Sequence, residues 1–259
     1  MGRLINWVIN FGRRQAKRLL AVGIILGLFF LAQLPVLSKA EKNTIAEHFA
    51  FSRLPLPQVM MGQGKQERVV NPHLVRHSGW ISAVGAAIAL NDLDGDGLPN
   101  DLCQVEPRTD QIIVAPVPGS GNRYQPFTLE TPQGGYLAGT IAPMGCVPQD
   151  MNEDGQMDLL VYYWGRTPIA FLHQSGKALG KTSYLAQTIV PDVPSEQWFT
   201  NAATFADMDG DGHSDLVVGN YFADNADILN PDATNTPEMQ DSMTRAYNGR
   251  AISMSIKGE

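Results

Sequence analysis

Acidic residues are missing from the start of the chain, and basic residues are sparse in the remainder. The first 40 of the 259 residues contain no Asp or Glu, although the whole chain has 26 of them. Of the 19 Lys and Arg residues, 13 lie beyond residue 40, so that part of the chain is strongly acidic. Nucleic-acid binding depends on cationic contacts to phosphate, so this charge balance speaks against it.

Cysteine is also scarce, with Cys103 and Cys146 as the only two. In an exported chain they can form a disulfide, and both fall in predicted strands of neighbouring units. Two buried free thiols are an equally good interpretation of the sequence. No Cys lies near the apolar run at the N-terminus, which speaks against a lipoprotein anchor.

The acid-free N-terminus has the pattern of an export signal. A basic segment ending at Arg18 precedes an apolar run over residues 19–32, which extends less cleanly to Leu37. One interpretation is a signal peptide cleaved after Ala40, with Ser38 at position −3. As a helix, residues 19–37 would also span roughly 28 Å, so a membrane anchor is the other interpretation, slightly favoured by the long lead before the run. Either one predicts an exported protein, membrane-anchored or secreted and periplasmic, because the positive flank stays inside.

The usual catalytic signatures are absent. His73 and His77 are four residues apart, but neither has a Glu beside it as a zinc protease requires, and Asn71-Pro72 disfavours a continuous helix there. Ser78-Gly79 and Ser120-Gly121 lack the context of a nucleophile elbow. We therefore predict that the protein is not an enzyme.

Three copies of one acidic loop dominate what is present. They are Asp92-Leu-Asp-Gly-Asp-Gly97, Asp150-Met-Asn-Glu-Asp-Gly155 and Asp207-Met-Asp-Gly-Asp-Gly212. Ca²⁺ takes six to eight oxygen ligands, and carboxylates at loop positions 1, 3 and 5 can turn inward around one ion. The Gly at position 6 permits the positive φ of a sharp turn. Asp-Gly also makes turns that hold no metal, but clustered carboxylates repel one another unless something neutralises them.

A further acid closes each loop early, which separates these loops from EF-hands. It is Asp158 or Asp215 at position 9, and Asp101 at position 10 of the first loop, where Asn100 is an alternative ninth residue. An EF-hand instead needs a bidentate Glu at position 12 and flanking helices. Position 12 carries Cys or Val in all three loops.

The spacing of the loops predicts a repeat of β-strands. Their first aspartates are 58 and 57 residues apart, a period typical of propeller blades or other repeat units. Apolar, β-branched and aromatic residues flank each loop, so each loop is predicted to join two strands of one hairpin. The segments before the loops are residues 83–90, 141–148 and 198–206, and further strands are predicted at 111–116 and 168–173.

This pattern of Asp-x-Asp/Asn-x-Asp-Gly-x-x-Asp-Leu followed by an apolar strand resembles the FG-GAP, or VCBS-type, repeat of integrin-α-like β-propellers. The resemblance covers residues 80–222, with a one-residue insertion in the first loop. The stretches 85–102, 144–167 and 237–249 further resemble bacterial proteins of the ASPIC/UnbV, cartilage-acidic-protein-like group. The resemblance implies an all-β fold of three to four recognisable propeller blades, preceded here by the N-terminal apolar helix. The predicted divisions are 1–40 (signal or anchor), 41–79 (linker), 80–222 (three repeats) and 223–259 (surface loop and a possibly truncated end).

The predicted function is an exported calcium-binding module for binding or adhesion. Its partners would be calcium ions, the membrane through the N-terminal segment, and an extracellular protein or glycan. The predicted Ca²⁺ ligands are Asp92, Asp94, Asp96 and Asp101 for one ion, Asp150, Asn152, Asp154 and Asp158 for a second, and Asp207, Asp209, Asp211 and Asp215 for a third. The carbonyls of Leu98, Gln156 and His213 would complete the spheres. The alternatives are an accessory domain of a biosynthetic or polysaccharide-active enzyme system, and a metal-independent structural propeller fragment.

Overall fold

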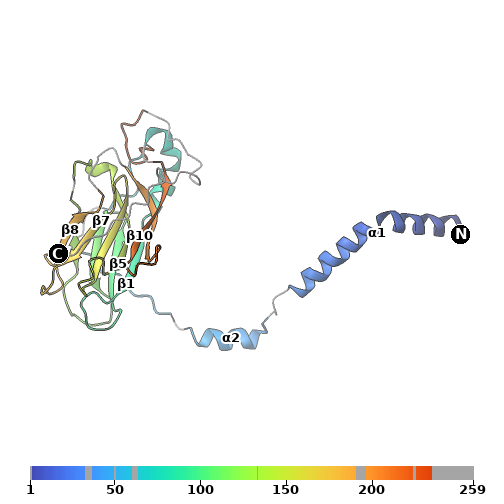
Figure 1. Ribbon diagram of the computed structural model, residues 1–259, viewed down its shortest axis with the longest axis horizontal. Coiled ribbons are helices and arrows are strands. Elements are labelled where there is room, and N and C mark those ends of the chain that lie inside the picture. The colour runs from blue at the N-terminus through green and yellow to red at the C-terminus, as the bar shows by residue number, and fades with distance from the viewer. Residues whose placement is uncertain are drawn as a thin grey trace. The chain divides into compact units, whose positions relative to one another are not determined.

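The chain is described as two compact units, Met1–Arg53 and Leu54–Glu259. The computed structural model describes residues 2–32, 37–49, 51–59, 64–132, 134–190, 197–223 and 226–234 (Figure 1). Most of the predicted C-terminal segment, including the stretch 237–249, therefore lies outside the described residues.

The first unit is helical. Helix α1 spans Gly2–Leu31 and helix α2 spans Lys39–Glu47. The predicted cleavage site lies at the start of α2, where Ser38 caps the helix and forms a capping box with Glu41. Of the apolar run predicted to extend to Leu37, residues 19–31 belong to α1, and residues 33–36 lie outside the described residues. Within the described residues, no helix is both long enough and apolar enough to cross a membrane, so the predicted anchor is not found as a spanning helix.

The described part of the second unit is mostly β-structure, as predicted. Three short helices accompany the strands: η1 (Pro72–His77), α3 (Ser78–Ala83) and η2 (Ala138–Thr140). The strands are β1 (Ala87–Asn91), β2 (Asp101–Glu106), β3 (Gln111–Pro116), β4 (Phe127–Leu129), β5 (Ala142–Gln149), β6 (Asp158–Trp164), β7 (Ile169–His173), β8 (Tyr184–Thr188), β9 (Phe199–Ala206) and β10 (Asp215–Phe222).

The strands follow a simple antiparallel order. β1 to β4 form one four-stranded sheet in chain order. In the second sheet, β5 to β8 also pair in chain order, and the hairpin β9–β10 joins β6 through one pair, Trp164 with Phe199. Each acidic loop connects the first two strands of its unit, so the three predicted hairpins are confirmed. In the described residues the two sheets do not close into a barrel, and a ring of propeller blades is not established.

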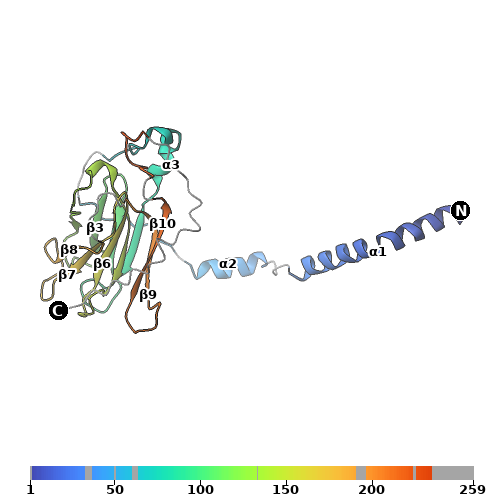
Figure 2. The same cartoon turned by 45° about the horizontal axis from the view of Figure 1, so that its top comes forward.

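Three groups of strands, β1–β4, β5–β8 and β9–β10, stack face to face through apolar side chains. Between β1–β4 and β5–β8, the core contains Cys103, Ile112, Val114, Phe127, Cys146, Leu159, Val161, Tyr163, Ile169 and Phe171. The opposite face of β5–β8 packs against β9–β10 through Leu160, Ala170, Leu172, Ala203, Phe205 and Leu216. A third cluster involves α3 and the segment 226–229 at one end of the strands (Figure 2). Each acidic loop is thus held by a hairpin, and each hairpin packs against the adjacent group of strands.

A disulfide between Cys103 of β2 and Cys146 of β5 links the strand groups β1–β4 and β5–β8. Both cysteines lie in the core between the two sheets. Of the two interpretations that the sequence allowed, pairing is therefore the one observed.

Candidate metal-binding loops

The first, second and third loops (residues 92–101, 150–158 and 207–215) share one set of internal hydrogen bonds. The position-1 carboxylate accepts the N–H of the position-6 Gly at 2.8, 2.9 and 3.1 Å, respectively. The position-5 carboxylate accepts the N–H of position 7 at 2.8, 2.8 and 2.9 Å. All three position-6 glycines have a positive φ, between 82° and 91°, as the sharp turn requires. The loops are therefore one structural motif used three times.

The closing acid has the same place in every loop. Asp101, Asp158 and Asp215 each accept the N–H of loop position 2, at 2.8, 3.0 and 2.9 Å. Asn100 does not take this place in the first loop; its amide donates to Asp96 at 3.1 Å. The inserted residue is thus accommodated before Asp101, and Asp101 is the equivalent of the other two closing acids.

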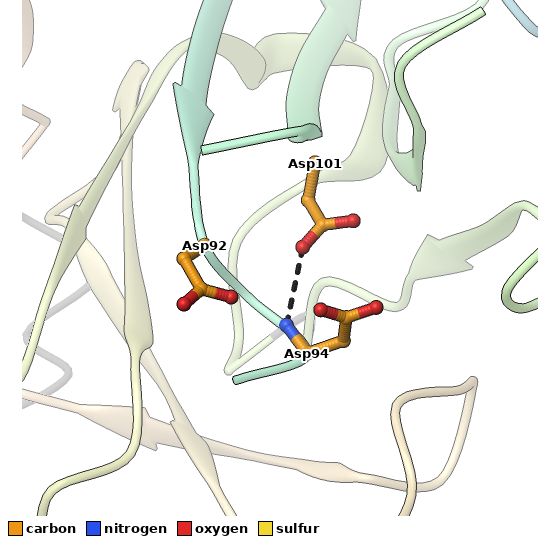
Figure 3. Close-up of side chains that lie close together, drawn as sticks. All are labelled: Asp92, Asp94 and Asp101. Atoms are coloured by element: carbon orange, nitrogen blue, oxygen red, sulfur yellow. Dashed lines mark hydrogen bonds between the residues drawn. The ribbon is translucent and has the colours of Figure 1, made fainter. Parts of the chain in front are cut away.

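Carboxylates converge in the first and third loops. In the first loop, oxygens of Asp92, Asp94 and Asp101 lie within 4.8 Å of one another (Figure 3). Asp207, Asp209 and Asp215 converge equally closely in the third loop. The second loop has Asn152 at position 3 in place of an aspartate, so its predicted ligand positions carry one carboxylate fewer.

Burial makes the closing acid of the second loop electrostatically unusual. Asp158 is fully buried at the start of β6. Its burial raises its pKa to about 6, and the charges of Asp154 and Asp150 act in the same direction. Two backbone N–H groups, from His173 and Met151, oppose the rise by hydrogen bonding to the carboxylate. A cation beside these carboxylates would favour the charged form of Asp158.

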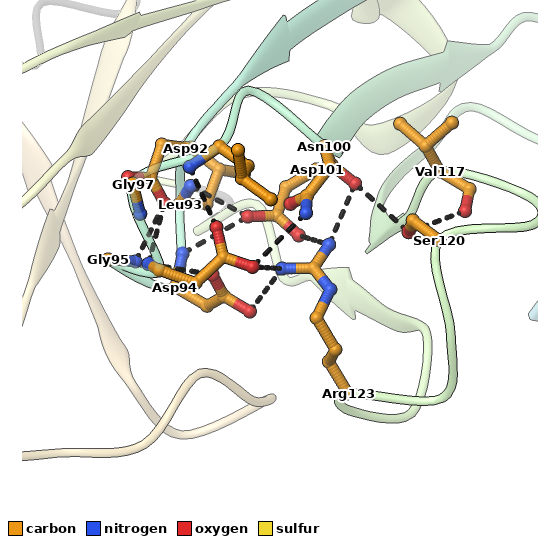
Figure 4. Close-up of polar contacts among 12 residues, drawn as sticks. Asp92, Leu93, Asp94, Gly95, Gly97, Asn100, Asp101, Val117, Ser120 and Arg123 are labelled. Carbon is orange, nitrogen blue, oxygen red and sulfur yellow. Dashed lines mark hydrogen bonds and ion pairs between the residues drawn. The ribbon is translucent and has the colours of Figure 1, made fainter.

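The first loop already contains a positive charge. Arg123, between β3 and β4, forms ion pairs with Asp94, Asp96 and Asp101 (Figure 4). Its Nη2 also donates to the Asn100 carbonyl at 2.7 Å. Burial alone would lower the pKa of Arg123, but the hydrogen bond to Asp101 and the three aspartate charges raise it above its usual value.

The second and third loops touch each other. The ring Nδ1 of His213 lies 2.6 Å from Glu153 Oε1, and this hydrogen bond raises the pKa of His213. The His213 side chain is exposed, and it bridges the two loops. Next to this contact, Gln149 Nε2 at the end of β5 lies 3.4 Å from Ser214 Oγ of the third loop.

Comparison with known protein families covers part of this arrangement. A family model described as FG-GAP-like repeat matches residues 150–218, which contain the second and third loops and strands β6 to β9 complete. This segment is similar to an FG-GAP-like repeat. No curated protein and no solved structure matches the chain, and the additional resemblance to the ASPIC/UnbV group is not confirmed.

The donor chemistry of the FG-GAP-like loops suits a hard cation. Positions 1, 3, 5 and 9 supply carboxylate or amide oxygens only, which are the ligands that Ca²⁺ prefers. The His213 ring is directed to Glu153. The ligand predicted at loop position 7 is therefore still the backbone carbonyl of His213. In the first loop, the Leu98 carbonyl accepts the N–H of Asn100 at 2.8 Å.

Sequence reasoning missed two residues that contact the first loop. Arg123 and Tyr124 reach Asp101 from 22 and 23 positions along the chain, and the Tyr124 hydroxyl donates to Asp101 Oδ1 at 2.9 Å. No spacing rule joins these residues to the acidic motif. The available signal was composition: Arg108 and Arg123 are the only basic residues between the first and second loops.

Proposed function

We propose that this protein is an exported binding module in which calcium held by the second and third loops stiffens a propeller-like stack of sheets. The third loop carries the proposal. Its three converging carboxylates bear net negative charge, and within the described residues no Lys or Arg forms an ion pair with them. Such a cluster is costly unless a cation neutralises it.

The propeller-like character rests on the strand order. A propeller blade is a four-stranded antiparallel sheet, and β1–β4 and β5–β8 each have that order. The hairpin β9–β10 corresponds to the first half of a third such unit. The FG-GAP-like match over residues 150–218 supports the same interpretation. We infer that the partner is an extracellular protein or glycan, because modules of this type serve binding.

Two features of the chain support export, and the proposed calcium sites are consistent with it. The N-terminus is basic, free of acids and followed by an apolar run. The disulfide between Cys103 and Cys146 is the kind of bond that persists in oxidising compartments. Extracellular calcium modules also function with weak sites, at ~10⁻⁴–10⁻³ M, because calcium is abundant there.

The test is calcium titration together with thermal unfolding of the full chain, in calcium and in excess chelator. A ligand that binds only the folded state adds about 2.7 kcal/mol of stability at a hundredfold excess over Kd. We expect a clear rise in Tm with calcium. The double variant Asp207→Asn/Asp209→Asn should lose one bound ion and part of that rise.

Glu130→Gln is the matched control, since Glu130 is an exposed acid outside the loops. It should titrate as the unchanged protein does. If calcium neither binds nor raises the Tm of the unchanged protein, the calcium function is wrong, and a metal-independent structural role becomes the better explanation.

A further inference from the structure

The first loop differs from the other two in how its charge is balanced. Among the described residues, the second and third loops form no ion pair with Lys or Arg; their ion pair is between their own His213 and Glu153. The first loop receives a guanidinium in the middle of its acids. The three loops therefore share one pattern of backbone hydrogen bonds but balance their negative charge in two different ways.

The contacts of Arg123 use the oxygens that a cation would need. Nη1 bonds to Asp94 and lies 3.3 Å from Asp96 Oδ2, while Nη2 bonds to Asp101 and to the Asn100 carbonyl. Asp94 and Asp101 are two of the three acids that converge in this loop. Figure 4 shows the guanidinium pointing into the cluster from the connection between β3 and β4.

The chain around Arg123 fixes it in this position. The N–H of Val117 donates to the Asn100 carbonyl at 2.8 Å, and the Val117 carbonyl in turn accepts the N–H of Ser120 at 3.0 Å. This turn ties the segment before Arg123 to the residue inserted in the first loop. The Arg123 side chain is only 19% exposed, and its guanidinium lies 5.7 Å from the Tyr124 ring centroid. Arg123 is thus a built part of the loop and not a solvated surface cation.

We propose that Arg123 is a tethered counter-cation that neutralises the first loop, so that this loop is stable without metal and excludes calcium while the second and third loops take it. The calcium part rests on the function proposed above. The physical reason is competition: a divalent ion entering the first loop must displace a guanidinium that forms ion pairs with three of the loop's carboxylates. The loop insertion that admits Arg123 would then mark a change of role within the repeat.

The first experiment is calcium titration of the full chain and of Arg123→Gln. The unchanged protein should bind about two ions, and Arg123→Gln should gain a third, because its first loop regains uncompensated carboxylates. Arg108→Gln is the matched control. Arg108 pairs with Glu106 at an exposed turn, so this variant should still bind about two ions. An unchanged protein that binds three ions, with no gain in Arg123→Gln, would overturn the proposal.

A second pair of variants does not depend on Arg123→Gln folding. Asp92→Asn and Asp207→Asn change the same position in the first and third loops. Asp92→Asn should leave the number of bound ions unchanged, while Asp207→Asn should lower it by one. A loss of one ion in Asp92→Asn would contradict the assignment.

Thermal unfolding in chelator separates this proposal from the calcium function. Without calcium, Arg123→Gln should have a lower Tm than Arg108→Gln, since only Arg123 neutralises a loop. That result would support the counter-cation even if no variant bound calcium. Equal Tm values for the two variants would overturn it.

Discussion

The closing acid of each loop accepts the same backbone hydrogen bond, but these acids are buried to different extents. Asp158 is fully buried and accepts N–H groups from Met151 and from His173 of β7, at 3.0 and 2.7 Å. Asp215 is only half-buried and accepts the N–H of Met208. Burial removes competition from water, so the loss of a carboxylate leaves its N–H partners unsatisfied to different extents.

This difference predicts unequal costs for the same substitution. Asp158→Ala should lower the free energy of unfolding by ~2–4 kcal/mol, since one buried and one part-buried N–H group lose their acceptor. Asp215→Ala should lower it by about 1 kcal/mol, because one N–H is left nearer to solvent. Urea unfolding in the presence of chelator measures both without any calcium effect. Equal costs would show that burial of the closing acid does not govern its contribution.

The sequence identified the repeated acids but not their partners. Position counting was sufficient for the loop carboxylates, because they bond within nine or ten residues and the backbone turn is encoded locally by Asp and Gly. It left Asn100 and Asp101 as alternatives, and only the hydrogen bond from Leu93 resolved them. Arg123 was missed because its position depends on the packing of a distant connection, which no local pattern records.

At the scale of elements, long apolar strands were predictable and short ones were not. The strand predicted at residues 111–116 is β3 with the same bounds, and β5, β7 and β9 each begin within one residue of prediction. β4 and β8 were missed: one has three residues, and the other alternates between half-buried and exposed side chains. The strand predicted from residue 83 begins at Ala87, because α3 ends at Ala83 and Gly85 turns the chain with a φ of 91°.

The end of β6 depends on a glycine, which gives a prediction at this scale. Gly165 has a φ of 82°, and a Cβ there would lie 2.0 Å from the Thr140 carbonyl oxygen. Gly165→Ala therefore adds a backbone clash to the cost of a left-handed residue and should lower the free energy of unfolding by about 3 kcal/mol or more. Chemical denaturation midpoints provide the measurement.

Gly176 is the matched control for Gly165. It has a similar φ of 76°, but nothing lies within 4 Å of a Cβ built there. Gly176→Ala should cost only the left-handed conformation, about 1–2 kcal/mol. If the two variants are equally stable, the approach of Thr140 to Gly165 is not tight enough to matter.

At the scale of the whole molecule, neighbouring groups of strands are held together mainly by packing between their faces. The first and second sheets share one apolar core but no strand pairing, while within the second sheet β5–β8 meet β9–β10 through side-chain packing and a single strand pair. Apolar side chains at the outer faces of the stack remain exposed, among them Ile88 and Leu90 of β1 and Val217 of β10. The disulfide is the covalent link between the first two sheets.

The last prediction concerns that link. Cys103 and Cys146 are 43 positions apart, so their bond closes a long loop in the unfolded chain. By the loop-entropy relation, the double variant Cys103→Ala/Cys146→Ala should lose ~2–4 kcal/mol of unfolding free energy. Reductant should lower the stability of the unchanged protein by a similar amount and leave the double variant unaffected. Two free thiols in the folded, unreduced protein would contradict the pairing, and with it one of the supports for the proposed export. If instead the predicted loss is observed, part of the stability of the stack depends on a bond that persists in oxidising compartments, as the proposed export requires.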